Sequence, residues 1–279
     1  MEKKFWWPPL SAWPIGPRHE KPRTQGITMV FDKGMGMNAF QDLLETAGEY
    51  IDFIKLGFGS AALYRSEMLA QKVTMARRYG VELYTGGTLT ELAYWQGLFD
   101  EFLYTLRSHG IQWIEISDGT IHLSSRERKS LIQKAVAQNF KVLTEVGKKD
   151  PKKHLALPAL IQQIVEDTNE GADYVIVEGR ESGKDVNLYD EDGAIREKDM
   201  EMLVESLPSL DILLWEAPLK DQQQMLIENF GPNVNLGNIP SPEVIALESL
   251  RRGLRSDTLR QALTGRSWQE EIHPSTKII

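Results

Sequence analysis

The 279-residue chain contains no cysteine, so disulfides, thiolate metal sites, iron–sulfur clusters and cysteine nucleophiles are all excluded. It also has no apolar run that approaches the ~20 residues needed to cross a membrane, so we expect no membrane partner. Acidic residues outnumber basic ones by 40 to 32, which gives a formal net charge of −8 with neutral histidines. This deficit of Lys and Arg argues against nucleic-acid binding, because such binding neutralises phosphates with a cationic surplus. The net charge does not exclude small anionic substrates, because these interact only with the groups of their own pocket.

Residues 1–25 contain three tryptophans among five prolines, which predicts an irregular arm. The prolines interrupt every apolar run, whereas a secretory signal needs ~7–15 continuous apolar residues. We therefore expect a cytoplasmic protein. We also expect Trp6, Trp7 and Trp13 to pack onto the body of the protein or onto a neighbouring subunit, and a homo-oligomer is the expected state.

From residue 26 onward, short apolar runs alternate with longer segments of helical pattern. Such short runs are typical of strands that are buried on both faces of a parallel sheet. The predicted strands are 27–31, 51–56, 81–85, 112–116, 141–145, 174–178, 212–216 and 234–236. Eight β-then-α units in about 250 residues predict a (β/α)8 TIM barrel as the catalytic domain over 26–254, followed by a C-terminal tail at 255–279. A doubly wound open sheet is the alternative, because sequence alone does not reveal closure.

Two helices carry clear local signals. Ser124 and Glu127 have the spacing of a capping box, which predicts a helix that begins after Ser124. Another helix is predicted from five apolar residues spaced alternately three and four apart, because that spacing places them on one face. These residues are Leu92, Trp95, Phe99, Phe102 and Leu106.

Four glutamates close successive predicted strands at the same relative position. They are Glu115, Glu145, Glu178 and Glu216. In a (β/α)8 barrel the active site lies at the C-terminal ends of the strands, so we expect these carboxylates to converge in the barrel mouth. Converging carboxylates raise one another's pKa values and repel, so we expect a cation among them.

Oxygen ligands without cysteine or paired histidines favour a hard cation, and Mg²⁺ is our first choice. Magnesium usually takes only one or two protein carboxylates, so four glutamates exceed what one ion needs. We expect its ligands to be Glu115, Glu145 and Glu178, and Glu216 is equally suited to a supporting position outside the coordination shell. The remaining carboxylates would hold the basic residues of the ring, which are Lys55, Lys148 and Arg180.

The same rim carries groups suited to an anion. The guanidinium of Arg180 forms a planar fork that matches phosphate or carboxylate. Further candidates for substrate binding lie at other strand ends; they are Gly86, Gly87, Ser117, Gly237 and Asn238. We expect the amides of the two adjacent glycines after the third strand to approach a ligand closely. The pair at 237–238 should follow the last strand and precede a helix at Ser241, the usual phosphate site of these barrels, which favours a phosphorylated substrate.

Eight runs at the strand ends resemble the phosphosulfolactate synthase (ComA) family. They read ITMVFDKGMG, DFIKLGFGSA, ELYTGGTL, WIEISDGTI, LTEVGKK, VIVEGRESG, LLWEAP and VNLGNI. The resemblance extends over about residues 26–254. It implies a (β/α)8 barrel and a Mg²⁺-dependent enzyme, a carbon–sulfur lyase that adds sulfite to phosphoenolpyruvate.

The family chemistry implies roles for the basic residues. Sulfite attacks C3 of phosphoenolpyruvate and leaves negative charge at C2, which a metal on the carboxylate oxygens would stabilise. A lysine with a lowered pKa would then protonate C2. Lys148 in the run EVGKK is the first choice for this donor, Lys55 is its rival and could bind sulfite instead, and Lys33 is third. Arg180 and the rim at 237–238 would hold the phosphate.

Two other functions stay open from the sequence. The barrel could serve another Mg²⁺-dependent enolate reaction, such as that of an aldolase with a different nucleophile. It could also be a non-catalytic, stress-associated protein, because plant heat-stress-associated proteins resemble the same family. The presence of all three expected metal ligands together with Lys148 and Arg180 favours catalysis, since a binding-only barrel has no need of them.

Overall fold

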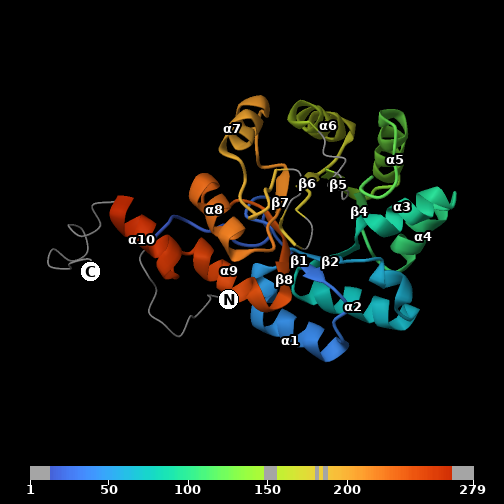
Figure 1. The fold of residues 1–279 in the computed structure, drawn as a ribbon. Coiled ribbons are helices and arrows are strands. Elements are labelled where there is room, and N and C mark those ends of the chain that lie inside the picture. The colour runs from blue at the N-terminus through green and yellow to red at the C-terminus, as the bar shows by residue number, and fades with distance from the viewer. Residues whose placement is uncertain (1–12, 148–155, 180–181, 185–187, 266–279) are drawn as a thin grey trace.

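Eight parallel strands form a barrel at the centre of the molecule (Figure 1). The computed structural model describes residues 13–147, 156–179, 182–184 and 188–265. The strands are β1 (Thr28–Asp32), β2 (Phe53–Leu56), β3 (Glu82–Thr85), β4 (Trp113–Ile116), β5 (Lys141–Val146), β6 (Tyr174–Val177), β7 (Leu213–Glu216) and β8 (Leu236–Pro240). Their hydrogen-bonded order is β3-β2-β1-β8-β7-β6-β5-β4, and β3 and β4 at its two ends lie side by side. The sheet returns on itself, so the predicted (β/α)8 TIM barrel is confirmed.

Helices surround the strands in chain order, from blue α1 to red α9 in Figure 1. They are α1 (Met37–Ala47), α2 (Ser66–Arg78), α3 (Gly87–Trp95), α4 (Phe99–Ser108), α5 (Ser125–Ala137), α6 (Leu157–Glu170), α7 (Glu197–Ser206), α8 (Lys220–Phe230) and α9 (Val244–Arg251). A further helix, α10 (Ser256–Gly265), lies in the segment expected as a tail. Because strands that are consecutive in sequence are neighbours all the way round, the doubly wound alternative is wrong.

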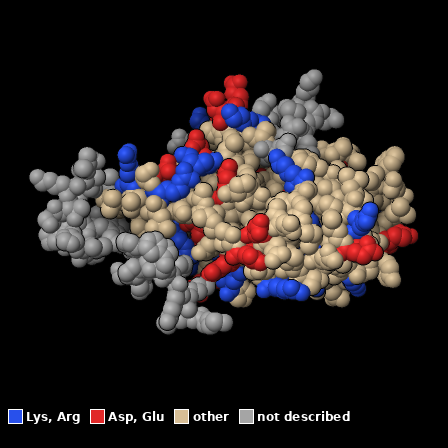
Figure 2. Space-filling view, turned by 90° about the horizontal axis from the view of Figure 1, so that it is seen from below, with Lys and Arg blue, Asp and Glu red and all other residues tan. Residues whose placement is uncertain are grey.

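The surface mixes charges of both signs. On the face shown in Figure 2, acidic and basic side chains of the described residues are interspersed, and they form no continuous basic stripe. No helix within the described ranges combines the length and the apolar character needed to span a bilayer.

Seven predicted strands agree with the structure within two residues at either end. The eighth is wrong: the sequence predicts 234–236, whereas β8 spans Leu236–Pro240. Asn235, which the prediction placed in the strand, precedes it. Its side chain accepts a hydrogen bond from the Ile27 amide at 3.0 Å and donates to the Leu213 carbonyl at 3.0 Å. The asparagine therefore joins the starts of three strands, at the end of the barrel away from the predicted site.

Gly237 and Asn238, expected in a loop after the last strand, lie inside β8. A Cβ on Gly237 would lie 2.7 Å from Met29 Cε, so Met29 packs closely over this glycine inside the barrel. Asn238 has a φ of +53°, and the register between β1 and β8 shifts in this region. The pair marks an irregularity within a strand, whereas in sequence it looks like a turn. The helix expected at Ser241 begins as a 3₁₀ turn, and α9 follows it.

The helix predicted over 92–106 is two helices, α3 and α4. Gly97 separates them with a φ of +73°, a left-handed conformation that glycine adopts without strain. Phe99 is buried, whereas Leu92 is 44% exposed and Trp95 is 73% exposed. The prediction of one shared face is therefore wrong, because the apolar spacing continues across a turn that redirects the chain.

The capping box at the start of α5 is confirmed. The Glu127 amide donates to Ser124 Oγ at 3.3 Å, and Glu127 Oε2 accepts from the Ser124 amide at 2.8 Å. Hydrogen bonds from the hydroxyls of Ser124 and Tyr94 lower the pKa of Glu127 to about 2. The cap fixes the residue at which the segment after β4 becomes helix.

The N-terminal arm is described from Trp13 onward. The guanidinium carbon of Arg252 lies 4.4 Å from the centre of the Trp13 ring, so packing onto the body is confirmed for this tryptophan. Trp6 and Trp7 lie outside the described residues. Further along the arm, Arg18 donates to a carboxylate oxygen of Glu248 at 3.2 Å and so ties the arm to α9.

Three aromatic rings close the N-terminal end of the barrel. The Trp113 ring centre lies 4.7 Å from that of Phe53 and 6.1 Å from that of Tyr174. A hollow of about 960 Å³ lies outside these rings and is bordered by arm residues 21–25. The aromatic layer separates this hollow from the carboxylates in the barrel mouth.

Arg251 is fully buried and joins the segments that lead into β1 and β8. Its guanidinium donates to the carbonyls of Pro232 at 2.6 Å, Val234 at 2.7 Å and Ile27 at 3.1 Å. We predict that Arg251→Met lowers the free energy of unfolding by about 3 kcal/mol, because these carbonyls lose their donors. Urea denaturation measures the difference. As a control, Arg78→Met removes the same charge from an exposed position in the last turn of α2 and should cost about 1 kcal/mol or less. Equal losses in the two variants would contradict the prediction.

Candidate active site

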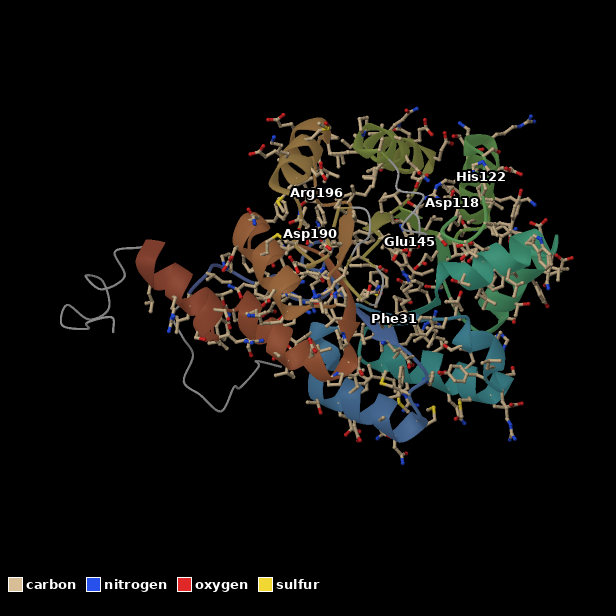
Figure 3. The ribbon with its side chains drawn as sticks, in the orientation of Figure 1. Phe31, Asp118, His122, Glu145, Asp190 and Arg196 are labelled. Atoms are coloured by element: carbon tan, nitrogen blue, oxygen red, sulfur yellow. The ribbon has the colours of Figure 1, made fainter. Side chains whose placement is uncertain are left out.

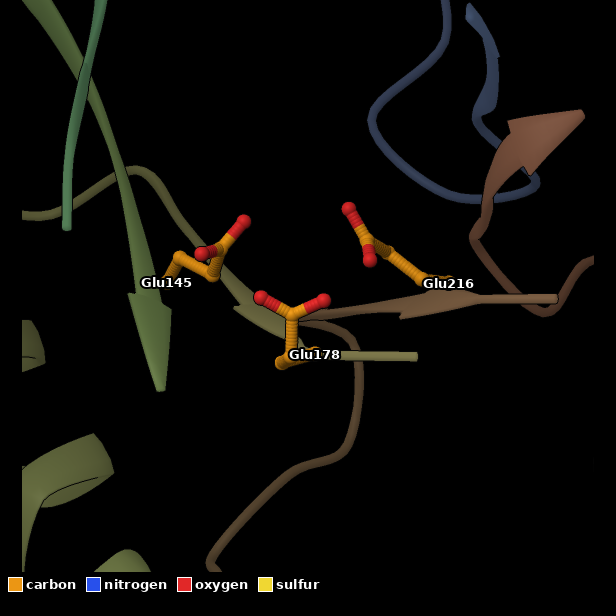
Figure 4. A group of neighbouring side chains, drawn as sticks. All are labelled: Glu145, Glu178 and Glu216. Atoms are coloured by element: carbon orange, nitrogen blue, oxygen red, sulfur yellow. The ribbon is translucent and has the colours of Figure 1, made fainter. Parts of the chain in front are cut away.

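The four glutamates predicted at the strand ends converge in the barrel mouth. Glu115 lies in β4, Glu145 in β5 and Glu216 in β7, and Glu178 directly follows β6. None of the four is more than 2% exposed. Figure 4 shows three of them pointing toward one another, and one carboxylate oxygen from each of these three lies within 4.8 Å of the others. The expected convergence is therefore confirmed.

Strand periodicity explains why these side chains face inward. Residues two apart in a strand share a face, so Glu115 points to the same side as Trp113. Trp113 packs against Phe53 across the barrel, and Lys55 follows Phe53 by two residues in β2. Glu115 and Lys55 thus lie one layer closer to the C-terminal ends of the strands than Trp113 and Phe53, whose rings close the N-terminal end of the barrel.

Lys55 provides a cation within this ring of carboxylates. Its Nζ lies 3.0 Å from Glu115 Oε2 and 3.2 Å from an oxygen of both Glu145 and Glu216. Burial alone lowers the pKa of Lys55, but the charges of the three glutamates, Glu115 first, outweigh burial and raise this pKa well above its usual value. Lys55 is therefore charged at neutral pH. The roles that the sequence analysis gave Lys55, proton donor or sulfite ligand, stay predictions.

Glu115 is held by the second of the two glycines that follow β3. The Gly87 amide donates to Glu115 Oε1 at 2.6 Å, and the Gly86 amide donates to the Leu56 carbonyl at 3.0 Å. A Cβ on Gly87 would lie 2.0 Å from Ser117 Oγ, so only glycine allows this approach. Both amides thus have partners inside the protein, and the substrate contacts expected of Gly86, Gly87 and Ser117 stay predictions.

Glu216 is held just as firmly on the other side of the mouth. Its Oε2 accepts from the Gly179 amide at 3.0 Å, and its Oε1 faces Lys55. The Tyr189 hydroxyl donates to the Glu216 carbonyl at 2.8 Å. A Cβ on Gly179 would lie 2.5 Å from that same carbonyl oxygen. The run EGRESG, singled out in the sequence for its arginine, therefore also positions a carboxylate through its first glycine.

Three carboxylates form a group that could hold a metal ion: Glu145, Glu178 and Glu216. Buried carboxylate oxygens are the donors that Mg²⁺ prefers, so the chemistry of this set fits a hard cation. The sequence favours Glu115 as a ligand; Glu115 lies outside this group, and its oxygens meet the Gly87 amide and Lys55. Glu216 belongs to the group, and its oxygens likewise meet an amide, that of Gly179, and Lys55. The choice among these carboxylates as metal ligands stays a prediction. A cation bound there would share Glu145 and Glu216 with Lys55.

The site has a supporting layer on the helices that the sequence analysis missed. Arg128 in α5 donates to both carboxylate oxygens of Asp167, at 2.7 and 2.5 Å, and to the Glu145 carbonyl at 3.0 Å. Burial lowers the pKa of Arg128, but Asp167 more than compensates and the pKa is raised. Glu91 in α3 accepts from Ser117 Oγ at 2.9 Å. The only sequence signal for these residues is a charge on the inner face of a helix.

Residues 16–257 match the family described as (2R)-phospho-3-sulfolactate synthase (ComA). The chain belongs to this family. A relative from Methanothermobacter thermautotrophicus, named phosphosulfolactate synthase, is 46% identical over 87% of this chain and 95% of its own length. One of the same name from Methanocaldococcus jannaschii is 44% identical over 84% of this chain and 94% of its own length. The family resemblance of the strand ends is therefore confirmed, and these relatives support an enzyme.

A solved structure described as phosphonopyruvate hydrolase shares the fold. Its TM-score is 0.52 at 15% sequence identity, and the match covers 92% of this chain and 88% of that one. Identity this low supports the barrel architecture and carries no information about the reaction.

Two key residues of the phosphosulfolactate synthase-like runs, Lys148 and Arg180, lie outside the described residues. Lys33 is described: it is exposed, and its Nζ lies 5.9 Å from the centre of the Phe31 ring. The preceding residue, Asp32, pairs with the fully buried Lys72 of α2 at 2.8 Å. This pair anchors the end of β1 and so fixes where the segment carrying Lys33 begins.

We predict that Lys55→Gln lowers the free energy of unfolding of the metal-free protein by about 3–5 kcal/mol, because buried carboxylates lose their counter-ion. The raised pKa keeps Lys55 charged below the unfolded-state value of about 10.4, so its contribution is fully present there and fades only as pH rises through the folded-state value. Urea denaturation in EDTA should therefore give the same loss at pH 7 and pH 9.

Lys134→Gln is the control, because its ion pair with Asp100 is exposed and should contribute at most about 1 kcal/mol. Added Mg²⁺ should recover more stability in Lys55→Gln than in the wild type, since the variant leaves more negative charge for the ion. A loss confined to the higher pH, or no loss, would show that Lys55 does not balance the ring.

Proposed function

We propose that this family member joins sulfite to C3 of phosphoenolpyruvate, with Mg²⁺ as cofactor, to give phosphosulfolactate. One observation carries the proposal. Three buried carboxylates, Glu145, Glu178 and Glu216, meet beside Lys55 in the mouth of a barrel whose relatives are named phosphosulfolactate synthases. The reaction needs such a mixture of charges, because both substrates are anions and must be brought together at one point.

The proposed step balances without a leaving group. The sulfur lone pair of sulfite forms a bond to C3 as the C2–C3 π bond breaks, and that electron pair moves to C2 and the adjacent carboxylate. A proton then binds at C2, and the phosphate ester stays intact. The enzyme is thus a carbon–sulfur lyase that works in the synthetic direction. Bound Mg²⁺ would supply positive charge to the substrate carboxylate as it takes up the electron pair.

The residues of the chain divide the remaining work. Lys55 is charged and sits at the base of the mouth, which suits it to attract an anion rather than to release a proton. We keep Lys148 as the donor to C2 and Arg180 as the phosphate ligand, on the strength of the runs EVGKK and EGRESG. Lys33, exposed at the end of β1, is the alternative donor. A cytoplasmic homo-oligomer remains part of this proposal.

The direct test is turnover of phosphoenolpyruvate and sulfite by the purified protein, with product detected by mass spectrometry. We expect phosphosulfolactate with Mg²⁺ present and none when EDTA replaces it. Sulfate in place of sulfite is the control, because it lacks the sulfur lone pair that must attack C3. Absence of product at saturating substrates and Mg²⁺ would contradict the proposed reaction. Product formation in EDTA would contradict the role of the metal.

The proton donor is tested by single lysine changes. We predict that Lys148→Ala lowers kcat by about 10²–10⁴-fold, the usual contribution of a general acid, while binding of phosphoenolpyruvate with Mg²⁺ changes little. Steady-state kinetics and calorimetry give the two quantities. Lys149→Ala is the matched control and should keep its kcat. A large loss in Lys33→Ala with none in Lys148→Ala would reassign the donor to Lys33.

A further inference from the structure

The hydrogen bonding between β6 and β7 changes where the two strands reach the barrel mouth. Lower in the barrel, the Val175 amide donates to the Ile212 carbonyl at 2.9 Å. A parallel ladder repeats every two residues, so its continuation would bring the Gly179 amide to the Glu216 carbonyl. The Gly179 amide donates instead to Oε2 of the Glu216 side chain, at 3.0 Å. The carboxylate of Glu216 has therefore taken the partner that the carbonyl of the same residue would have in a regular ladder.

Tyr189 gives the Glu216 carbonyl another donor. Its hydroxyl donates to this carbonyl at 2.8 Å, and both residues are at most 2% exposed. Burial, and then the charge of Glu216, raise the pKa of Tyr189, so the hydroxyl keeps its proton and remains a donor. The Tyr189 ring also lies against Gly179, because a Cβ there would lie 3.1 Å from ring carbon Cε2. A buried carbonyl is costly to leave without a donor, so Tyr189 stabilises the arrangement in which the Gly179 amide holds the carboxylate.

A closed turn between β6 and α7, residues 189–195, carries Tyr189 to this position. The first and last residues of the turn form an antiparallel bridge. From α8, the buried side-chain amide of Gln222 donates to the Gly193 carbonyl within the turn at 3.1 Å. In Figure 3, Asp190 marks the turn on the side of the barrel where α7 and α8 lie. The turn is thus fixed to a helix of the barrel, and the position of Tyr189 is set by the fold.

We propose that Tyr189 is a positioning residue for the metal group, because its bond to the Glu216 carbonyl leaves the Gly179 amide to orient the Glu216 carboxylate. This inference rests on the proposed function, in which Mg²⁺ binds to Glu145, Glu178 and Glu216. Gly179 directly follows Glu178, so its amide also ties together two of the three carboxylates that converge in Figure 4. Without the Tyr189 hydroxyl, the Gly179 amide would return to the Glu216 carbonyl, and the carboxylate would lose its fixed orientation.

The first test measures Mg²⁺ binding to the full chain by calorimetry, without substrates. Tyr189→Phe keeps the ring and removes the hydroxyl. We expect this variant to raise the Kd for Mg²⁺ by about 10–100-fold, the usual effect of losing a group that orients a metal ligand. Tyr174→Phe is the matched control, because the Tyr174 hydroxyl also donates to a backbone carbonyl, that of Thr24 at 3.0 Å, but at the opposite end of the barrel. The control should keep the wild-type Kd. A Kd that is unchanged or lower in Tyr189→Phe, or an equal rise in both variants, overturns the inference.

A crystal structure of metal-free Tyr189→Phe gives a second readout that does not depend on Mg²⁺. We expect the Gly179 amide to lie within hydrogen-bond distance of the Glu216 carbonyl oxygen, with Oε2 turned away from it. If the amide still donates to Oε2, the hydroxyl does not set the orientation of the carboxylate and the inference fails.

A further variant asks whether the turn acts on the site through Tyr189. Gln222→Met removes the amide that holds the turn against α8. We expect a smaller rise in the Kd for Mg²⁺ than in Tyr189→Phe, and little further rise when the two changes are combined. Rises that multiply in the double variant would mean that the turn reaches the metal group by another route and would contradict the inference.

The same measurements separate this inference from the proposed function. A raised Kd in Tyr189→Phe, together with a wild type that makes no phosphosulfolactate, supports the role of Tyr189 and rejects sulfite addition. Normal turnover with an unchanged Kd in Tyr189→Phe rejects the role of Tyr189 alone. A wild type that binds no Mg²⁺ rejects both the metal of the proposed function and this inference.

Discussion

The ammonium of Lys55 is the interaction on which the rest of the mouth depends. Four carboxylates that are almost completely buried cannot stay ionised together without positive charge among them, because burial removes the water that would screen them. Lys55 meets three of these carboxylates at about hydrogen-bond distance. A second cation, held by Glu145, Glu178 and Glu216, would offset the remaining negative charge of the mouth. Charge neutrality thus links the protein's own lysine to the proposed metal.

Backbone amides and helix residues hold these carboxylates in place. Gly87 and Gly179 each donate an amide to a glutamate, and at both positions a side chain would collide with the site. Arg128 fixes the Glu145 carbonyl from behind. A carboxylate that has its position set by the fold loses little entropy when it binds a cation or orients a substrate. Gly87 and Gly179 therefore fix the positions of Glu115 and Glu216 and do not serve to make the strand ends flexible.

The sequence predicts the barrel and its ring of glutamates because both follow from one-dimensional periodicity. Side chains alternate along a strand, so a glutamate that ends each apolar run must project into the mouth. Other features depend on three-dimensional contacts that leave no such pattern. Gly97 turns an apparent single helix into two, and Gly237 lies inside a strand, where Met29 packs against it. Glu216, and not Glu115, belongs to the group with Glu145 and Glu178 because of the distances between their oxygens, which spacing in the sequence cannot reveal.

The ladder of backbone hydrogen bonds is continuous from β3 round to β4 through β1, and within the described residues no ladder joins β3 directly to β4. Glu115 on β4 bridges the junction between β3 and β4. Its carboxylate accepts a hydrogen bond from the Gly87 amide, which follows β3, and pairs with Lys55 on β2. A carboxylate of the barrel mouth therefore links the two edges of the sheet. Loss of the Glu115 side chain would therefore remove a link between the two edges of the sheet as well as a charge from the barrel mouth.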